Sequence, residues 1–239
     1  MIQAAAERRK RRVSARPFSY NISMTATYDS DFDSFGGCDG KSVIELDPPL
    51  FGDSRGFFCE VFKSRHGWNE LKQINRSKSA EYTVRGCHAQ TGRFCQAKFV
   101  QALNMKIYDV ITDARPDSKT FGITKAYVLD PARQNMLFVP RGFLHAFCVP
   151  KGSDGALFEY FCDNVYDKRS ETGVNPLSVI PSLAMSFKDD EMFGGLAEMF
   201  SDISRLRLSE KDTAAERFSE WASRIADEYA TTGKLWYVG

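Results

Sequence analysis

The chain has three histidines, and two of them lie in segments suited to acid–base or metal chemistry. His88 lies in VRGCHAQ, and His145 closes the pattern Pro-x-Gly-x-x-His in FVPRGFLHAF, whereas His66 lies in a polar turn and is expected at the surface. In small metal-binding barrels such a turn leads into an inward-facing histidine ligand. Those sites need further histidines, and the earlier segment offers His88 alone. We therefore predict no metal site, because zinc sites take at least three protein ligands.

Polar and charged residues also occur in segments that otherwise look apolar and half buried. They are Arg55, Glu60, Gln73, Asn75, Arg85, Lys98 and Asp109. A buried charge costs free energy unless it is paired or occupied by a ligand. Structural ion pairs would explain any one of these residues, but together they would make a poor core. A lumen that holds a polar, anionic ligand explains the group better.

Short strands are the elements expected to position these residues. Between residues 42 and about 180, segments rich in β-branched and aromatic residues, such as KIYDVITDA and ALFEYFC, alternate with turn segments such as ARPDSKTFG and PKGSDG. No helical pattern of useful length separates the strands. This spacing predicts a mainly β fold, either a sandwich or a barrel.

The two ends of the chain differ from this β core. Residues 1–41 begin with a basic segment that no apolar stretch follows, so we expect a flexible or partner-packed arm rather than a secretory signal. Residues 42–239 form the predicted domain, in which about 181–208 reads as an insert.

A helical period near the C-terminus predicts a helix over about 210–231 that packs back on the β core. Its apolar stripe consists of Phe218, Trp221, Ile225 and Tyr229. Ser209 is the expected N-cap, and Asp212 stands in the capping-box position three residues later.

The composition excludes several classes of protein. The chain has 239 residues with 43% hydrophobic content, which suffices for a real core, and its net charge of +1 lacks the basic excess of a nucleic-acid binder. No apolar run approaches the roughly 18 residues that cross a bilayer. The six cysteines include no C-x-x-C pair, so we expect reduced thiols in a cytoplasmic protein.

Seven motifs occur along the chain in this order: GDSRGFFCEVF, QINRSKS, VRGCHAQ, AKFVQAL, YDVITDARPDSKTFG, FVPRGFLHAF and EYFCDNVYDKRSE. This order resembles the dTDP-4-keto-6-deoxyglucose (dTDP-4-dehydrorhamnose) 3,5-epimerase family over about residues 43–175, and the likeness resumes at LSEKD. The resemblance implies a cupin-like β-barrel or jelly roll. It also implies an isomerase of deoxysugar and polysaccharide biosynthesis, of the rhamnose-pathway type.

The chemistry of that family concerns a nucleotide-linked sugar whose 4-ketone acidifies the hydrogens on both adjacent carbons. Epimerisation removes one proton and returns one to the opposite face, which requires a base, an acid and a positive group near the ketone oxygen. The resemblance implies that His88 is the base, that Asp212 orients it, that Tyr160 is the acid and that Lys98 stabilises the enolate. It implies no metal and no organic cofactor. Without that role, Asp212 would only cap the helix and Tyr160 would only pack in a strand.

The remaining matches concern substrate binding. By resemblance, Arg85, Gln73 and Asn75 bind the pyrophosphate and sugar, His145 lies in the sugar pocket, and Tyr166 lies near the nucleotide. Arginine suits phosphate oxygens because its donors form a planar fork.

Two further matches imply an assembly. Arg55 and Glu60 correspond to residues that reach the nucleotide from a neighbouring subunit. The active protein would then be a homodimer whose sites are shared between subunits.

The chain also departs from the family pattern. Ala89 replaces an aromatic residue after the base histidine, a Trp-Asn-Asp-Pro segment is reduced to residues 173–176, and the insert precedes LSEKD. These changes suggest an altered pocket, with a different sugar, a different nucleotide or inversion at one carbon only. The function that the resemblance implies is inversion at C3, at C5 or at both, and the alternatives are a 3-only or 5-only epimerase and a ketoisomerase on a related sugar. A metal-dependent cupin enzyme and a catalytically silent sugar-nucleotide-binding module are further alternatives.

Overall fold

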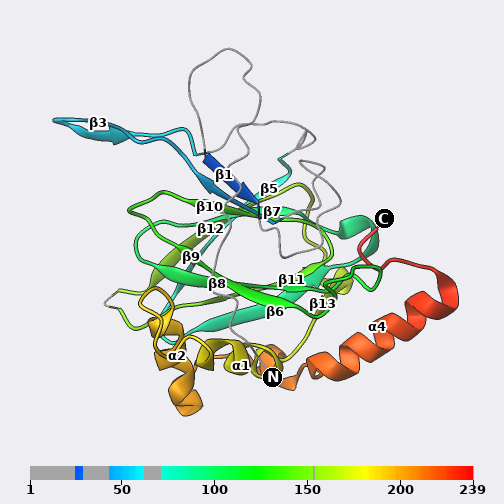
Figure 1. Ribbon diagram of the computed structural model, residues 1–239. Helices are drawn as coiled ribbons and strands as arrows, with labels where there is room; N and C mark the ends of the chain where they lie inside the picture. The colour runs from blue at the N-terminus through cyan, green and yellow to red at the C-terminus, as the bar shows by residue number, and fades with distance from the viewer. Residues whose placement is uncertain (1–24, 29–42, 62–70, 153, 239) are drawn as a thin grey trace.

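The computed structural model describes residues 25–28, 43–61, 71–152 and 154–238. Two antiparallel sheets form its body (Figure 1). The first sheet has the strand order β1 (Thr25–Tyr28), β2 (Ile44–Asp47), β10 (Met136–Val139), β7 (Lys98–Ala102), β12 (Ala156–Cys162) and β5 (Gln73–Ser79). The second has the order β13 (Glu171–Gly173), β6 (Val84–Gln90), β11 (Phe143–Cys148), β8 (Ile107–Asp113) and β9 (Thr124–Leu129). The mainly β fold predicted from the strand and turn pattern is confirmed.

The second sheet is covered on both faces, and this explains its uninterrupted apolar strands. Every residue of β8 and of β11 is buried. On one face, side chains such as Ile107, Phe147 and Phe158 fill the space between the sheets. On the other, Val110 and Leu144 belong to a cluster that includes residues of the helices. The outer strand β5 instead alternates between exposed and less exposed residues, as a strand with one wet face does.

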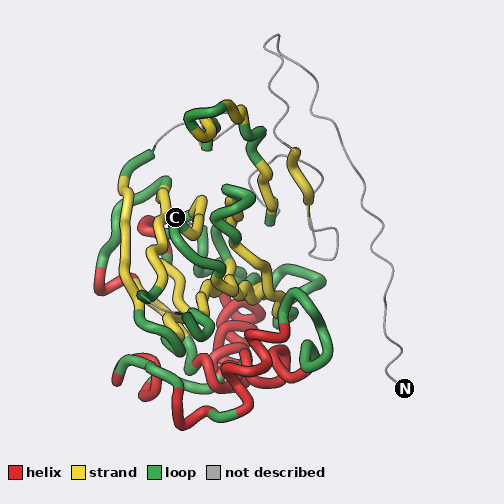
Figure 2. The backbone as a smooth tube through the Cα atoms, turned by 90° about the vertical axis from the view of Figure 1, so that its left-hand side faces the viewer, coloured by secondary structure: helices red, strands yellow, loops and turns green. Residues whose placement is uncertain are grey.

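The helices lie beneath the second sheet, together on one side of the molecule (Figures 1 and 2). They are α1 (Ile180–Met185), α2 (Gly194–Ser201), α3 (Glu210–Ala214) and α4 (Phe218–Thr232). The described residues also contain the short 3-10 helices η1 (Gly92–Phe94), η2 (Lys168–Ser170), η3 (Pro176–Ser178) and η4 (Ile203–Arg205). The segment expected as an insert therefore contains two helices and one 3-10 turn. Within the described ranges, no helix has the length and apolar character needed to cross a membrane.

The structure divides the expected C-terminal helix into α3 and α4. Ser209 caps α3 as predicted, since its side chain accepts the amide of Asp212 at 3.1 Å. Past α3 the chain is extended, and Asn175 bonds it on both sides of the break. Its side chain donates to the carbonyl of Thr213 in α3 at 3.0 Å, and its amide N–H donates to the carbonyl of Glu216 beyond α3 at 2.9 Å. These long-range bonds compete with the intrahelical ones, and α4 begins anew after Arg217.

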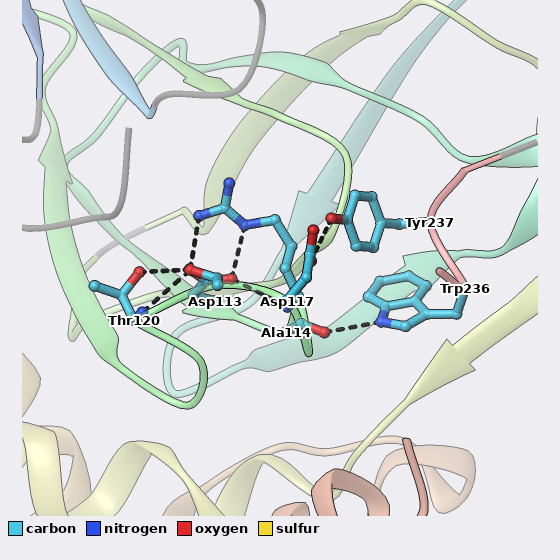
Figure 3. Close-up of polar contacts among 8 residues, drawn as sticks. Asp113, Ala114, Asp117, Thr120, Trp236 and Tyr237 are labelled. Carbon is cyan, nitrogen blue, oxygen red and sulfur yellow. Dashed lines mark hydrogen bonds and ion pairs between the residues drawn. The ribbon is translucent and has the colours of Figure 1, made fainter. Parts of the chain in front are cut away.

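The residues after α4 return to the barrel. Gly233 ends α4 in the left-handed conformation (φ 67°), which favours glycine. Trp236 Nε1 then donates to the carbonyl of Ala114 at 2.8 Å, and the Tyr237 hydroxyl donates to Asp117 at 2.6 Å (Figure 3). These bonds attach the C-terminal segment to the loop between β8 and β9.

The hairpin of β3 (Phe51–Asp53) and β4 (Gly56–Phe58) is paired with neither main sheet and stands out from the body (Figure 1). Its large apolar side chains are exposed: Phe57 by 58% and Phe58 by 68%. The expected N-terminal arm, residues 1–41, lies outside the described residues except for β1. His66 and Cys38 also lie outside them, and the five described cysteines are free thiols.

Candidate active site

A cavity of about 660 Å³ opens between the two sheets. Its walls bring together the four residues proposed for catalysis, namely His88, Lys98, Tyr160 and Asp212. His88 comes from β6 of the second sheet, Lys98 and Tyr160 come from β7 and β12 of the first, and Asp212 comes from α3. The imidazole and the phenol therefore enter the cavity from walls formed by different sheets.

His88 and Asp212, which are 124 residues apart, form the tightest polar contact of the cavity. His88 Nε2 lies 2.6 Å from Asp212 Oδ1, and only 4% of the aspartate side chain is exposed. An ionised carboxylate only accepts hydrogen bonds, so Nε2 is the donor, and in the neutral form of the ring the lone pair is on Nδ1. The lone pair makes the imidazole a base, and Asp212 stabilises the cation that forms when the base accepts a proton.

Asp212 takes part in the cap of α3 and contacts His88 at the same time. Its backbone amide bonds Ser209, while its carboxylate points to His88. Burial alone would raise the pKa of Asp212, but the hydrogen bond from His88, with help from Ser209 and Lys211, holds that pKa below its usual value.

Acid titration tests the ionised state of Asp212. A carboxyl whose pKa is lowered by folding stabilises the protein fully above its unfolded value, near 3.8, and loses that contribution as the pH falls through the folded value. We therefore expect Asp212→Asn to lower the free energy of unfolding at neutral pH, with a gap from the wild type that closes below about pH 3.8. Urea unfolding at each pH measures the gap. Asp189→Asn removes an exposed carboxylate and should show no such gap, whereas a pH-independent gap for Asp212→Asn would contradict the assignment.

Two glycines leave the space that the observed position of His88 requires. Gly86 has φ of 121°, and a Cβ there would lie 2.5 Å from Ala146 Cα on β11. A Cβ on Gly173 of β13 would lie 2.7 Å from Cδ2 of the His88 ring. Any side chain at position 173 would thus displace the imidazole, which the motif analysis did not foresee.

Lys98 and Tyr160 lie close together on the opposite wall. Lys98 Nζ is 5.7 Å from the centre of the Tyr160 ring. Burial raises the pKa of the Tyr160 phenol, so it remains protonated and able to donate at neutral pH. Burial also lowers the pKa of Lys98, against the opposing negative potential of Asp109 and Glu171.

His145 also lines the cavity, but its imidazole is held by a buried carboxylate. Its Nε2 lies 2.9 and 2.8 Å from the two oxygens of Asp109, whose side chain is fully buried. One of the charged residues noted in the apolar strands is thus explained by a pair with a histidine.

The other expected binding residues occupy the rim. Arg85 lines the cavity and donates from Nε to Ser79 at 2.9 Å, which leaves its terminal nitrogens available. Asn75 is paired with Tyr160 across β5 and β12, so it faces the same side of the sheet. Gln73 donates to Asn75 at 2.8 Å and accepts the amide of Tyr166 at 2.8 Å. Neither Gln73, Asn75 nor Tyr166 is among the residues that line the cavity.

Arg55 and Glu60 are not brought to the cavity of their own chain. Arg55 lies at the turn of the protruding hairpin with its side chain 87% exposed, and it pairs with Asp53. Ala89 does not line the cavity either. It is buried at 8% exposure in the cluster that includes the helices, because neighbours along a strand face opposite sides. The expectation that Ala89 reshapes the pocket next to His88 is therefore not supported by its position.

Two further charged residues, Glu171 and Lys211, contact this site, although the sequence motifs did not single them out. Glu171 Oε1 lies 3.5 Å from His88 Nδ1 and 2.8 Å from Lys211 Nζ, and its other oxygen accepts the Tyr166 hydroxyl at 2.9 Å. Both residues stood inside quoted motifs, at the end of EYFCDNVYDKRSE and next to Asp212 in LSEKD. Among the residues that the structure describes, no group of three or more His, Cys, Asp or Glu side chains is arranged to hold a metal.

Comparison with known proteins agrees with this geometry. Residues 39–220 match the family described as dTDP-4-dehydrorhamnose 3,5-epimerase. A relative of that name from Shigella flexneri is 38% identical over 138 residues, which are 55% of this chain and 75% of the relative. The crystal structure of the enzyme of that name from Elizabethkingia anophelis has a TM-score of 0.64 at 29% identity and covers 84% of this chain and 98% of that one. A dTDP-6-deoxy-D-glucose-3,5-epimerase from Legionella pneumophila, solved with dTDP-4-keto-L-rhamnose, has a TM-score of 0.59 at 27% identity and covers 77% of this chain and 90% of that one.

These findings confirm the resemblance read from the seven motifs and the cupin-like barrel that it implied. The matched range runs from before the hairpin to the start of α4, and it contains every residue placed around the cavity. The chain belongs to the dTDP-4-dehydrorhamnose 3,5-epimerase family of isomerases.

Proposed function

We propose that the protein epimerises a nucleotide-diphosphate-linked 4-keto-6-deoxy sugar at C3, at C5 or at both, through an enolate. The observation that carries this proposal is the placement of an aspartate-bound imidazole and a protonated phenol on different walls of one cavity. Inversion at carbon needs a base on one face and an acid on the other, and this placement supplies both.

The steps balance with these residues and solvent protons. His88 Nδ1 takes the proton from the carbon beside the ketone, and the electron pair of that C–H bond moves into the enolate. Lys98 stabilises the oxygen as negative charge develops on it. The Tyr160 hydroxyl then donates a proton to the opposite face, and exchange with solvent restores the phenol and the neutral imidazole.

The same arrangement argues against a silent binding module, and the lack of an H-x-H motif in the sequence argues against a metal-dependent cupin enzyme. A binding module has no need for a histidine oriented by a buried carboxylate. The metal analysis of the purified protein would test the second alternative directly, and a stoichiometric metal that activity requires would contradict our proposal.

Solvent exchange tests the function. The protein is incubated in heavy water with dTDP-, GDP- and CDP-linked 4-keto-6-deoxyglucose, and the sugar is followed by NMR. We expect deuterium at C3, C5 or both, together with inverted product. The carbons labelled distinguish a 3,5-epimerase from a single-carbon epimerase, and absence of label from all three substrates would contradict the proposal.

We further propose a homodimer in which the hairpin of β3 and β4 reaches the partner's cavity. Its exposed phenylalanines and its separation from both sheets of its own chain support this reading, since apolar aromatic side chains in water mark interaction surfaces. The exposed Arg55 would then meet the nucleotide of the neighbouring site. Free, mostly buried thiols fit a reducing compartment, which supports a cytoplasmic location.

Mixing two inactive variants tests the shared site. In a mixed dimer of His88→Ala and Arg55→Ala, one site combines the intact His88 of one subunit with the intact Arg55 of the other. We expect a 1:1 mixture, after subunit exchange, to regain about a quarter of wild-type activity, because half of the dimers are mixed and each holds one intact site. If each chain uses its own Arg55, the mixed dimers contain no intact site and the mixture stays as inactive as its components.

A further inference from the structure

Arg207 belongs to the segment between η4 and α3, and it lines the same cavity as Arg85. Its backbone is bonded on both sides. The Arg207 amide donates to the carbonyl of Tyr82 at 2.8 Å, and its own carbonyl accepts the amide of Val84 at 3.0 Å. Thr83 and Arg207 thereby form a parallel bridge beside the start of β6.

This bridge determines the side to which Arg207 points. Paired residues of neighbouring strands face the same side, and so do residues two apart along one strand. Thr83, Arg85 and Arg207 consequently share a face, and all three line the cavity. Two guanidinium groups are thus presented side by side on adjacent segments of chain.

The side chains of Arg205 and Arg207 differ in the contacts that they make. Arg205 lies 4.1 Å over the Tyr82 ring and donates to its hydroxyl at 2.5 Å, which anchors the segment. Arg207 is exposed, and among the described residues its guanidinium has no hydrogen bond or ion pair. The guanidinium of Arg205 therefore has a partner within the protein, whereas that of Arg207, which lines the cavity, has none among the described residues.

The charge of the cavity indicates what this cation meets. The lining contains four cationic side chains and one carboxylate, namely Arg85, Lys98, Arg207, Lys211 and Asp212. Lys211 is paired with Glu171, and Asp212 is bound to His88. Lys98 is the cation proposed for the enolate oxygen, so Arg85 and Arg207 remain for a further anion. Two planar forks suit the oxygens of a diphosphate.

We propose that Arg207 binds the diphosphate of the nucleotide sugar together with Arg85. The segment that precedes α3 thus supplies a substrate-binding cation as well as carrying Asp212 into place. The inference rests on the proposed function for the class of substrate, but the binding of a diphosphate is measurable without turnover.

The test compares Arg207→Gln with the wild type in calorimetric titrations of dTDP, inorganic pyrophosphate and thymidine. We expect dTDP and pyrophosphate to bind about 10-fold more weakly, because a charge-assisted hydrogen bond is lost, and thymidine to bind equally well. Arg207→Lys should recover part of the loss, since it keeps the charge without the fork. Arg224→Gln removes a guanidinium on α4 outside the cavity lining and serves as the matched control.

Turnover provides a second readout. For the accepted sugar, Arg207→Gln should raise KM about 10-fold with little change in kcat, because the diphosphate is bound alike in substrate and transition state. Unchanged binding of dTDP and pyrophosphate, or an equal loss for thymidine, would overturn the role of Arg207. If the wild type exchanges no solvent proton into any sugar but binds dTDP in an Arg207-dependent way, the proposed function fails while this inference stands.

Discussion

His88→Ala is expected to abolish deuterium incorporation at both carbons beside the ketone. Each exchange begins with proton abstraction, and His88 Nδ1 is the basic nitrogen that Asp212 leaves free. A positioned general base typically contributes about 10²- to 10⁴-fold, so the loss lies well outside experimental error. The measurement is the NMR rate of label uptake in heavy water, with dTDP titration to show that the variant still binds.

Two further variants separate the loss of a base from a general loss of structure. Added imidazole should partly restore exchange in His88→Ala, because the removed ring leaves space in a cavity already open to ligands. Asp212→Asn keeps the base and should retain more exchange than His88→Ala. Full exchange in His88→Ala without imidazole would remove His88 from the mechanism and would direct attention to Glu171, whose carboxylate lies 3.5 Å from Nδ1.

Tyr160→Phe is expected to reduce inversion far more than exchange. Abstraction and return of a proton on the same face need only the base, whereas inversion also needs a donor on the opposite wall. Phenylalanine keeps the ring that lies near Lys98 and removes only the hydroxyl. Loss of a general acid should slow formation of the inverted sugar by about 10²- to 10⁴-fold.

A single NMR time course gives both rates for Tyr160→Phe, the label entering the starting sugar and the label in the epimer. Phe158→Leu changes a buried residue beside Tyr160 that also lines the cavity but carries no acid or base. It controls for loosened packing and should affect both rates together. A variant that forms epimer at the original rate would show that water or another residue is the acid.

Local patterns were sufficient for much of the fold. The strands of the barrel can be predicted from β-branched and aromatic segments between turn residues, because each strand must bury at least one face. Ser209 is recognisable as a cap because capping depends on residues three positions apart. The family motifs also predicted roles for His88, Lys98 and Tyr160, since these residues lie inside continuous segments.

Contacts between distant segments required the tertiary structure. The hydrogen bonds of Asn175 divide the C-terminal helix, although the apolar stripe through Trp221 continues without a local signal for the break. The strand register turns Ala89 toward the helices rather than the cavity.

The cavity shows most clearly the difference between what local patterns predict and what the tertiary structure decides. Asp212 reaches His88 across 124 residues only because α3 is held against β6, and Arg207 joins Arg85 only through a bridge of two backbone bonds. Such long-range contacts depend on the packing of whole segments. The free energy of that packing is spread over many residues far apart in the chain. A local pattern reports which side chains can do chemistry, and the register and packing of the elements decide which of them meet.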